Sequence, residues 1–523
     1  MAAYINLGNE AFASALRGNY VDKTGLIAEI NDTLFKEHRF SCVSRCRRFG
    51  KTMAAKMLCA YYDHSCDSRE LFKGLEIEKH ADFDTHLNKY PVIYIDMTNF
   101  VTRYKGNKDI VRIIQKSLIK DISQEYSGVP IEDGDDLMDL LLRISLKTGE
   151  KFFVIIDEWD AICREFAPGS TEMDEYVNLL RRMFKSSDAM RVFSGVYLTG
   201  IFPIKKYKTE SALNNFWEYS MVQPRNLARF YGFTKDEVRN LCMRHNMDFD
   251  EMVKWYDGYN IGNEESMFNP SSVMQAISAK ECDSYWAATG AFDAVARYIQ
   301  MDFEGLKGDV VQMLTGGSCP VDTTGFQNDP AIIQTKNDVF TVLIHLGYLA
   351  YNKAEKRCYI PNVEVAGELK NAIENNGWKN VMDTINASER LLGNLLDGDC
   401  EAVQEGIELA HERNASILEY NDENSLACVI GMAFYSARNK YKIIRELPTG
   451  KGFADMIFVP WRNVNLPAIV IELKWKQDAK TALDQIRERN YPSSLKEYVG
   501  DIILCGINYD PKSKEHTCVI ERI

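Results

Sequence analysis

Short apolar segments alternate with longer amphipathic segments over residues 1–230 of the chain. The apolar segments are almost continuous in Val, Ile, Leu and Phe, which is typical of strands buried on both faces of a parallel sheet. The expected strands are Arg39–Ser44, Pro91–Asp96, Phe152–Ile156 and Val192–Thr199. Helical periodicity lies between them, as in Thr52–Tyr62 and Asp109–Gln124. Residues 1–230 are therefore predicted to form an α/β domain around a parallel sheet.

Residues 231–402 follow a different pattern, in which one helix succeeds another through polar connections. One helix is expected to begin after Thr234, with Asp236 and Glu237 in its first turn. The segment Trp255–Ser272 is rich in aromatic and turn-forming residues, and we predict that it is too polar to be a strand. This region is predicted to be a helical lid or linker domain.

Residues 403–523 return to an α/β pattern. The first expected element is an amphipathic helix with Leu426, Val429, Ile430, Ala433 and Ala437 on one face. The elements expected after it are strands Tyr441–Glu446, Phe453–Val459 and Ala468–Trp475, a helix Lys480–Arg489, and strands Asp501–Gly506 and Thr517–Glu521. This order predicts a compact α/β domain.

Composition places the chain among ordinary globular proteins. Of its 523 residues, 46% are hydrophobic and 26% are charged. The sequence holds no apolar run long enough to cross a bilayer, and its first residues lack the pattern of a secretion signal. Its thirteen cysteines include no CxxC pair, and an odd count argues against a complete disulfide framework. We therefore expect a protein of the reducing cytoplasm without a membrane partner.

The net charge bears on the choice of partner. A formal charge of −13 argues against nucleic acid, because phosphate binding depends on clustered Lys and Arg. Residues 403–523 are nearly neutral, however, with 16 Lys and Arg against 17 Asp and Glu. Most of the acidity therefore lies elsewhere, which weakens the objection for the C-terminal segment.

A phosphate-binding pattern follows the first expected strand, in FSCVSRCRRFGKT. In such a loop the ammonium group of Lys51 would reach the β- and γ-phosphates and the hydroxyl of Thr52 would bind Mg²⁺. Backbone N–H groups from Gly50 onward would cradle the anion at the start of a helix. The usual first glycine of the motif is absent, and Arg45 stands in its place.

A second strand supplies the acidic partners of this loop. In KFFVIIDEWD, Asp157 would hold Mg²⁺ and Glu158 would polarise the attacking water. The later strand VFSGVYLTG ends in Thr199, whose hydroxyl is placed to sense the γ-phosphate. The same residues also fit a buried strand capped by solvated acids beside an unrelated basic turn. Likewise, Arg45, Arg47 and Arg48 fit either phosphate contacts or a solvated basic turn.

The C-terminal strands carry a second chemical pattern. The strand Ala468–Trp475 places Val470, Glu472 and Lys474 on one face, and Ile469, Ile471, Leu473 and Trp475 on the other. If Val459 pairs with Ala468 in a hairpin, Asp455 lies directly opposite Glu472.

Two opposed carboxylates repel one another, and a divalent cation such as Mg²⁺ or Mn²⁺ would remove that repulsion. Lys474 would then orient or deprotonate the attacking water and stabilise the phosphorane-like transition state. The alternative is a salt bridge from Lys474 to Asp455 or Glu472 on a solvated face. Gln485 is a candidate for contacts to the site, and Glu423 is either a further acidic ligand or only compensation of a helix dipole.

Several motifs together resemble the bacterial AAA-ATPase-like family, which is often fused to a C-terminal domain of the PD-(D/E)XK nuclease superfamily. The N-terminal motifs are YVDKT (Tyr20–Thr24), RCRRFGKT (Arg45–Thr52), IIDEWD (Ile155–Asp160), LTG (Leu198–Gly200), YGFT (Tyr231–Thr234) and WYDGY (Trp255–Tyr259). The tail, with ENSL, TGKGFADMIF, PAIVIELKW, ALDQIRERNY and GINYD, is similar to the fused nuclease domain.

The resemblance implies a P-loop NTPase sheet of the AAA type, a helical middle segment and a restriction-endonuclease-like α/β domain. Arg45 matches the phosphate loop of that family, while Cys46 replaces its proline. Asp455, Glu472 and Lys474 all match its nuclease motif. The implied cofactors are ATP and Mg²⁺ or Mn²⁺, and the implied partner is nucleic acid, with DNA favoured over RNA.

The leading hypothesis is an enzyme in which ATP binding or hydrolysis repositions a metal-dependent nuclease domain. One alternative is a nucleotide-dependent switch whose nuclease-like domain only binds nucleic acid or a protein partner. Another is a structural module that has kept both folds without either chemistry. The intact set of two carboxylates and a lysine favours the enzyme. AAA-like domains often assemble, so a homo-oligomer is consistent with this hypothesis.

Overall fold

The structure is a computed structural model whose described residues form two compact units. Residues outside the description are 1–2, 133, 168, 205–212, 287–296, 302, 327–332, 375–377, 419–422, 450–451, 462–463, 476–478, 481, 483–499 and 514, together with the side chains of 415–418, 423–425, 446–449, 452–455 and 475. Unit 1 comprises residues 1–247, 257–281 and 322–354. Unit 2 comprises residues 248–256, 282–321 and 355–523.

Unit 1 is built on a five-stranded parallel sheet with the strand order β2-β3-β4-β1-β5. Its strands are β1 (Phe40–Ser44), β2 (Val92–Asp96), β3 (Phe152–Asp157), β4 (Phe193–Gly200) and β5 (Trp217–Tyr219). The parallel sheet and four of its strands are thus confirmed. The edge strand β5 was not predicted, because a strand of three residues, of which only Tyr219 is buried, gives no apolar run to recognise.

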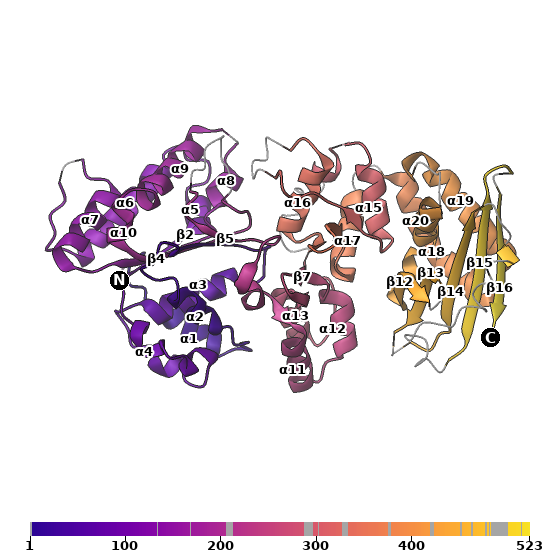
Figure 1. Ribbon diagram of the computed structural model, residues 1–523, viewed down its shortest axis with the longest axis horizontal. Helices are drawn as coiled ribbons and strands as arrows, with labels where there is room; N and C mark the ends of the chain where they lie inside the picture. Colours follow the sequence, from indigo (N-terminus) through magenta and orange to yellow (C-terminus); the bar gives the residue numbers. More distant parts are fainter. Residues whose placement is uncertain are drawn as a thin grey trace. The chain divides into compact units, whose positions relative to one another are not determined.

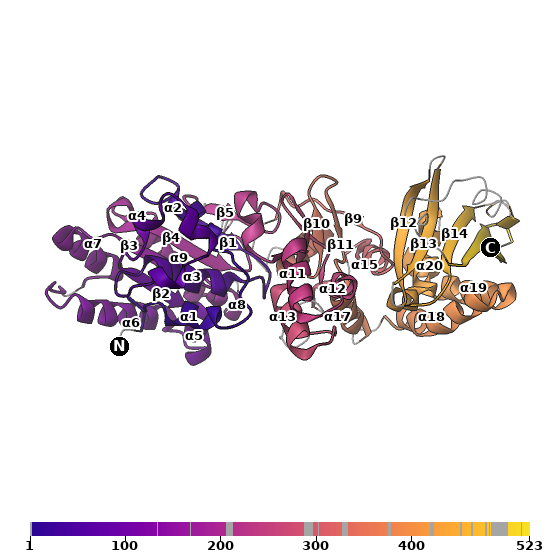
Figure 2. The ribbon, with the colours of Figure 1, turned by 90° about the horizontal axis from the view of Figure 1, so that it is seen from below.

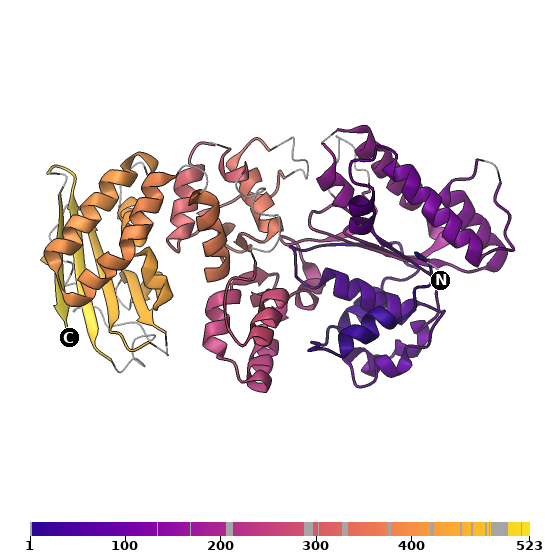
Figure 3. The same cartoon turned by 180° about the vertical axis from the view of Figure 1, so that it is seen from behind.

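Helices cover both faces of this sheet because both sets of alternating side chains are apolar. One face packs on α5 (Met97–Arg103), α6 (Ile110–Glu125), α7 (Leu137–Thr148) and α9 (Thr171–Phe184). The other packs on α1 (Glu10–Leu16), α2 (Gly25–Asn31), α3 (Lys51–Tyr62) and α4 (Phe83–His86). Figures 1 and 3 show the two sets of helices on opposite sides of the strands.

The segment Trp255–Ser272 contains a β-hairpin, so the prediction that it is too polar for a strand is wrong. Strands β7 (Tyr259–Ile261) and β8 (Glu264–Phe268) pair antiparallel, and β8 also pairs with β6 (Phe233–Thr234). The hairpin buries Tyr259, Ile261, Met267 and Phe268. Its two-residue turn begins at Gly262, which has a φ of +68°. Gly-Asn between two strands is a recognised hairpin signal, and it outweighs the polar composition.

The segment 231–402 is otherwise mainly helical, and it contributes residues to both units. Its helices are α11 (Lys235–His245), α13 (Pro270–Ala279) and α16 (Lys336–Leu346) in unit 1, and α12 (Phe249–Tyr256), α15 (Leu306–Leu314), α17 (Val363–Glu374) and α18 (Lys379–Asp397) in unit 2. The predicted start of α11 is confirmed, since Thr234 and Glu237 form a capping box there. The division of the chain into three domains at residues 230 and 402 stays a prediction.

Unit 2 contains a second five-stranded sheet, in which strands that follow one another in sequence lie next to one another. The strands are β12 (Tyr441–Thr449), β13 (Gly452–Pro460), β14 (Ala468–Trp475), β15 (Ile502–Asp510) and β16 (Glu515–Arg522). All neighbours are antiparallel except β14 and β15. The five strands expected from the sequence are therefore present, and they form a mixed sheet.

Helices α18, α19 (Cys400–Leu418) and α20 (Glu423–Ala433) lie along one face of this sheet (Figure 2). The five residues expected on the apolar face of the preceding helix are all buried, although α20 ends at Ala433 and Ala437 falls in a 3-10 turn. Most of the predicted helix Lys480–Arg489 lies outside the described residues.

Two expectations about the whole chain can be set against this fold. None of its thirteen cysteines, all of which lie in the described part of the chain, forms a disulfide. Among the helices described, none combines the length and the apolar character that crossing a membrane requires.

Candidate functional site

The loop between β1 and α3 holds the residues predicted to bind phosphate. Gly50 is the N-cap of α3 with a φ of +88°, a backbone conformation that favours glycine. Lys51 is the first residue of the helix, and its side chain is only 4% exposed. Its Nζ lies 3.2 Å from the carbonyl oxygen of Cys46 and 3.2 Å from Oε1 of Glu158. The ammonium group of Lys51 therefore lies at the N-terminal end of α3, as the P-loop interpretation predicts.

The acidic residues reach the same place from β3. Because β4 lies between β1 and β3, the carboxyl ends of the three strands meet at one edge of the sheet. There Thr199, at the end of β4, donates a hydrogen bond to Oδ1 of Asp157, and its Oγ1 accepts one from the backbone N–H of Glu158 at 3.1 Å. Tyr94 donates to the other oxygen of Asp157 at 3.3 Å. Thr199 is fully buried, and in this geometry it positions both acids.

Glu158 and Asp157 have opposite electrostatic environments. Burial opposes the ionisation of Glu158, but the charges of Lys51 and Arg164 outweigh it and hold the pKa of this carboxyl below its ordinary value. Nη2 of Arg164 lies 2.6 Å from its Oε2. Burial raises the pKa of Asp157, although hydrogen bonds from Thr199 and Thr52 partly oppose this. The ionised form of Glu158 is thus stabilised by its surroundings, whereas the ionised form of Asp157 is destabilised by burial.

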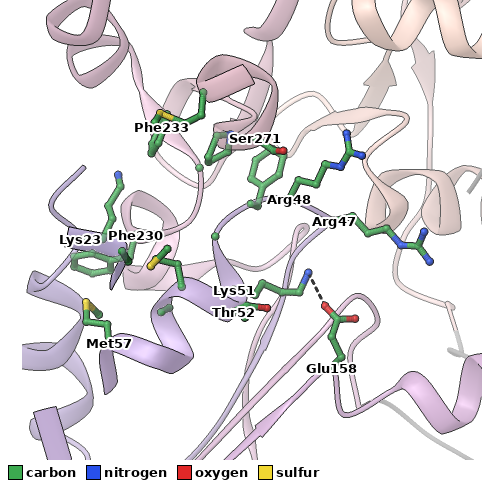
Figure 4. Close-up of a pocket in the computed structure, with 18 of the residues that line it drawn as sticks. Lys23, Arg47, Arg48, Lys51, Thr52, Met57, Glu158, Phe230, Phe233 and Ser271 are labelled. Carbon is green, nitrogen blue, oxygen red and sulfur yellow. Dashed lines mark ion pairs between the residues drawn. The ribbon is translucent and has the colours of Figure 1, made fainter. Parts of the chain in front are cut away.

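These groups border a cavity of about 930 Å³ in unit 1. Its lining includes the polar residues Arg47, Arg48, Lys51, Thr52, Glu158 and Arg164 and the apolar residues Tyr20, Met57, Phe230, Phe233 and Met274. In Figure 4 Lys51 and Glu158 lie toward one end of the cavity, the polar end, and Met57, Phe230 and Phe233 lie toward the other, the apolar end. Figure 4 shows the Lys51–Glu158 ion pair beside Thr52, with the guanidinium groups of Arg47 and Arg48 directed away from it. A polar end next to an apolar end suits a ligand that joins phosphates to an aromatic base.

Arg45 takes neither of the two roles considered for it. The residue is fully buried, donates hydrogen bonds to the carbonyl oxygens of Ser44 and Tyr219, and stacks over the ring of Tyr231 at 5.2 Å. Burial lowers its pKa to about 10. Arg45 therefore belongs to the core beneath the loop. The sequence pattern could not reveal this, because Tyr219 and Tyr231 are distant in the chain.

Two residues of the site escaped the sequence analysis. Arg164 pairs with Glu158 and lies 3.4 Å from Asp160. Lys23 lines the apolar end of the cavity, where it forms a 2.7 Å ion pair with Glu237 and donates to the carbonyl oxygen of Arg229. Lys23 lies within the motif YVDKT, and that motif was its only signal.

We expect Asp157→Asn to stabilise the protein at neutral pH. A pKa raised by burial means that the fold disfavours the ionised carboxylate, so asparagine should increase Tm at pH 7. The gain should disappear as the pH falls below about 3.8, where the carboxyl is protonated in both states. Differential scanning calorimetry across this range checks it, and a lower Tm for the variant at pH 7 would contradict it.

We expect Arg47 and Arg48 to act on nucleotide and not on nucleic acid. Because both line the polar end of the cavity, reversing both charges to glutamate should weaken ATP binding by roughly tenfold or more. DNA binding without ATP should not change. Calorimetry with ATP and anisotropy with DNA measure the two effects, with the exposed Lys73→Glu as the matched control. A selective loss of DNA binding would refute this assignment.

The second predicted constellation lies on β14 in unit 2. The expected faces are confirmed, since Ile469, Ile471 and Leu473 pack toward the helices while Val470 joins a small apolar cluster on the other face. Glu472 is 1% exposed and Lys474 is 9% exposed. Nζ of Lys474 donates to Oε1 of Glu472 at 3.0 Å. The salt bridge considered as an alternative is therefore present, but it is buried and not on a solvated face.

The expected pairing of β13 with β14 is also confirmed. Met456 lies opposite Ile471, Ile457 opposite Val470 and Phe458 opposite Ile469. In this register Asp455 and Glu472 follow as the next pair of positions along the two strands. The side chains of Asp455 and Glu423, and the whole of Gln485, lie outside the described residues.

The residues present fit a divalent cation in their chemistry. Glu472 offers a buried carboxylate beside a lysine. Oxygen ligands of this kind suit Mg²⁺ or Mn²⁺. Among the described residues, no three His, Cys, Asp or Glu side chains gather in a metal-binding arrangement.

Comparison with known proteins assigns two regions of the chain. Residues 8–209 match the family model described as "Predicted AAA-ATPase", and residues 421–518 match that of the PD-(D/E)XK nuclease superfamily. No curated protein matches the chain.

Two solved structures are similar at low identity. One is the ORC2 protein of Aeropyrum pernix in ADPNP and ADP complexes, with 12% identity, a TM-score of 0.34, and coverage of 68% of this chain and 96% of that chain. The other is the ORC1 protein of Aeropyrum pernix in complex with DNA, with 12% identity, a TM-score of 0.21, and coverage of 85% of this chain and 90% of that chain.

Proposed function

We propose that this chain, which joins an AAA-ATPase-like domain to a domain of the PD-(D/E)XK nuclease superfamily, hydrolyses ATP and cleaves nucleic acid with the help of a divalent metal ion. The observation that carries the proposal is the meeting of Lys51, Asp157 and Glu158 at one edge of the parallel sheet, beside a cavity large enough for a nucleotide. Ligands bind at this edge in open α/β sheets.

Four residues at this edge of the sheet have a role in the proposed ATP reaction: Lys51, Thr52, Asp157 and Glu158. Lys51 binds the β- and γ-phosphates, and Thr52 with Asp157 would hold Mg²⁺, which neutralises phosphate charge when it is bound. Glu158 accepts a hydrogen bond from the attacking water and orients it. For this Glu158 must leave Lys51, because its carboxylate is occupied by two cations in the ligand-free arrangement.

The nuclease proposal rests on β14. Asp455 and Glu472 would hold Mg²⁺ or Mn²⁺, which supplies an activated water and charge neutralisation when it is bound. Lys474 stabilises the charge that develops on the phosphate. The buried Glu472–Lys474 pair supports this role. A buried ion pair contributes little net stability, so stability alone does not explain why this pair is present. DNA is the proposed substrate and the cytoplasm the proposed location.

One observation favours a second candidate, a nucleotide-dependent switch that binds ATP without turnover. Glu158 has a lowered pKa, and Lys51 and Arg164 hold it on both sides. A general base works best with a pKa near the working pH, so this arrangement favours binding over proton abstraction. In that case the nuclease-like domain would bind nucleic acid or a protein partner only.

One experiment separates the two candidates. The purified protein is incubated with labelled DNA and labelled RNA, with and without ATP, in the presence of Mn²⁺ or EDTA. The enzyme hypothesis expects cleavage that EDTA abolishes and release of inorganic phosphate from ATP. Calorimetric titration with Mn²⁺ is the second measurement, because a binding-only domain has no need for a carboxylate-dependent metal site. Absence of both cleavage and ATP turnover refutes the proposed function.

A further inference from the structure

Two arginines of unit 2 lie against the backbone of a glycine pair. The turn Thr315–Ser318 follows α15, which packs beside α20 (Figure 1). A Cβ atom added at Gly316 would lie 2.9 Å from Nη2 of Arg438, and one added at Gly317 would lie 2.9 Å from Nη1 of Arg445. The glycines therefore leave the space in which two guanidinium groups, distant in sequence from the turn, approach it together.

Neither guanidinium group is neutralised by a carboxylate. Arg438 is half-buried, stacks over the ring of Tyr435 at 5.3 Å, and its Nε is buried without a hydrogen bond. Arg445 donates only a long hydrogen bond of 3.4 Å to Oγ1 of Thr315. In the part of the chain that the structure describes, neither arginine takes part in an ion pair. Burial, and to a smaller extent the charge of Arg445, lower the pKa of Arg438.

A third arginine binds the same turn. Arg357, on the short strand β11 (Arg357–Tyr359), donates to Oγ of Ser318 at 2.7 Å and also to its carbonyl oxygen. Three cations thus surround four residues of backbone. Like charges in this proximity are unfavourable, and the arrangement needs an anion or some other compensation.

We propose that Arg438 and Arg445, at the Gly316–Gly317 turn, bind a phosphodiester group of the nucleic acid. Guanidinium forks match phosphate oxygens in pairs, and such bonds are strong when the groups are partly desolvated. Arg445 lies on β12 opposite Met456, whose side chain packs with the helices of unit 2. The arginine site is therefore on the helix-covered face of the sheet, opposite the face of Glu472 and Lys474. This inference rests on the proposed function in taking nucleic acid as the ligand.

The alternative is that the arginines only compensate the negative end of helix α15. Cations near a helix C-terminus stabilise it, and that role requires no ligand. The two explanations differ in what a neutral substitution changes. Loss of helix compensation lowers Tm and leaves nucleic-acid affinity unchanged, whereas loss of a phosphate site lowers affinity and its dependence on salt.

The test uses the full chain and a short fluorescein-labelled DNA duplex in EDTA, which prevents metal-dependent cleavage. Fluorescence anisotropy measures affinity over a series of salt concentrations for the parent and for Arg438→Gln/Arg445→Gln. We expect affinity to fall by roughly tenfold or more. The slope of log K against log salt should become shallower by about 0.9, because the one phosphate that the two arginines neutralise contributes about 0.9 in duplex DNA. The exposed Arg390→Gln, on α18, is the matched control and should behave as the parent.

A measurement on the parent alone makes the test independent of how the variants fold. Phenylglyoxal labels arginines, and mass spectrometry reads the extent at each one. We expect DNA to protect Arg438 and Arg445 while leaving Arg390 equally reactive. Inorganic phosphate as a competitor should protect the two arginines only at much higher concentration than DNA, and equal protection would assign the site to free phosphate and overturn the proposal.

Failure of this inference differs from failure of the proposed function. Unchanged affinity and salt slope in the folded double variant, with metal-dependent cleavage intact, overturn the arginine site alone. Weakened binding in the double variant, in a parent that binds DNA without cleaving it, supports the arginine site and overturns the nuclease. A parent that does not bind DNA overturns both.

Discussion

Lys51→Ala is expected to weaken nucleotide binding by about one to two orders of magnitude. Lys51 is the charged group of the cavity that stands at the start of α3, where phosphates gain from both its ammonium group and the helix N-terminus. Loss of a charge-assisted contact costs about 1.5–3 kcal/mol, which corresponds to a weakening of roughly 10- to 150-fold. Isothermal titration with ATP and Mg²⁺ measures this directly. An affinity equal to that of the parent would refute the phosphate-loop assignment.

Lys51→Ala should also lower the stability of the protein, and this effect has to be separated from the effect on nucleotide binding. Alanine removes one of the two cations that hold Glu158, so the remaining carboxylate is less well compensated. The matched control is Lys51→Ala/Glu158→Gln, in which the unpaired charge is also removed. We expect the double variant to regain thermal stability and to bind nucleotide no better than Lys51→Ala does. Glu158→Gln alone should keep ATP binding and lose turnover, because only the orientation of water is affected.

The pH dependence of the parent follows from the same ion pairs. Because the pKa of Glu158 is held below its ordinary value of 4.5, the pairs contribute stability above that pH and lose it as the pH falls through the folded-state pKa. The difference in Tm between the parent and Lys51→Ala should therefore be largest at neutral pH and should become small at acid pH. A difference that grows below pH 4.5 would contradict this assignment.

Glu472→Gln is expected to eliminate metal-dependent cleavage of nucleic acid. Loss of a group that only supports a metal ligand lowers metal affinity or activity by about 10- to 100-fold, and loss of a ligand itself should lower them further. Asp455→Asn should have the same effect. Lys474→Ala should differ, since it should keep the Mn²⁺-dependent increase in Tm while cleavage is lost. Cleavage rates and melting curves for each variant, with and without Mn²⁺, are the measurements.

The buried ion pair requires a control for this experiment. Removing either Glu472 or Lys474 leaves the other charge buried, and such a loss costs about 3–5 kcal/mol, so each single variant should melt at a lower temperature without metal. Glu472→Gln/Lys474→Met should regain much of this stability and remain inactive. If EDTA changes neither the Tm nor the cleavage activity of the parent, the metal-dependent nuclease is the wrong assignment.

Local patterns in the sequence determined much of this architecture. Near-continuous apolar segments identified four strands of the first sheet, since a strand buried on both faces has no polar positions. Alternation in β14 placed Glu472 and Lys474 on one face, and the structure shows that this is the face away from the helices. The register assumed for the two strands, with Val459 opposite Ala468, agrees with their observed pairing. Gly50, Lys51 and Thr52 were identifiable because a phosphate loop is a contiguous motif.

Other features became visible only when distant segments met. The edge strand β5 and the hairpin Tyr259–Phe268 are short, and neighbouring strands stabilise them more than their own periodicity does. Arg45 fitted either a phosphate contact or a solvated basic turn, yet the ring of Tyr231 and the carbonyl oxygen of Tyr219, both far along the chain, hold it in the core.

The same reason applies to the arginine site and to the second cation on Glu158. Arg438 and Arg445 are ordinary charged residues in sequence, and their approach to Gly316 and Gly317 depends on how α15 packs within unit 2. Periodicity reports which side of an element is buried, because burial repeats along the backbone. Which partner a buried charge meets depends on contacts between segments far apart in the chain, and tertiary packing alone decides that.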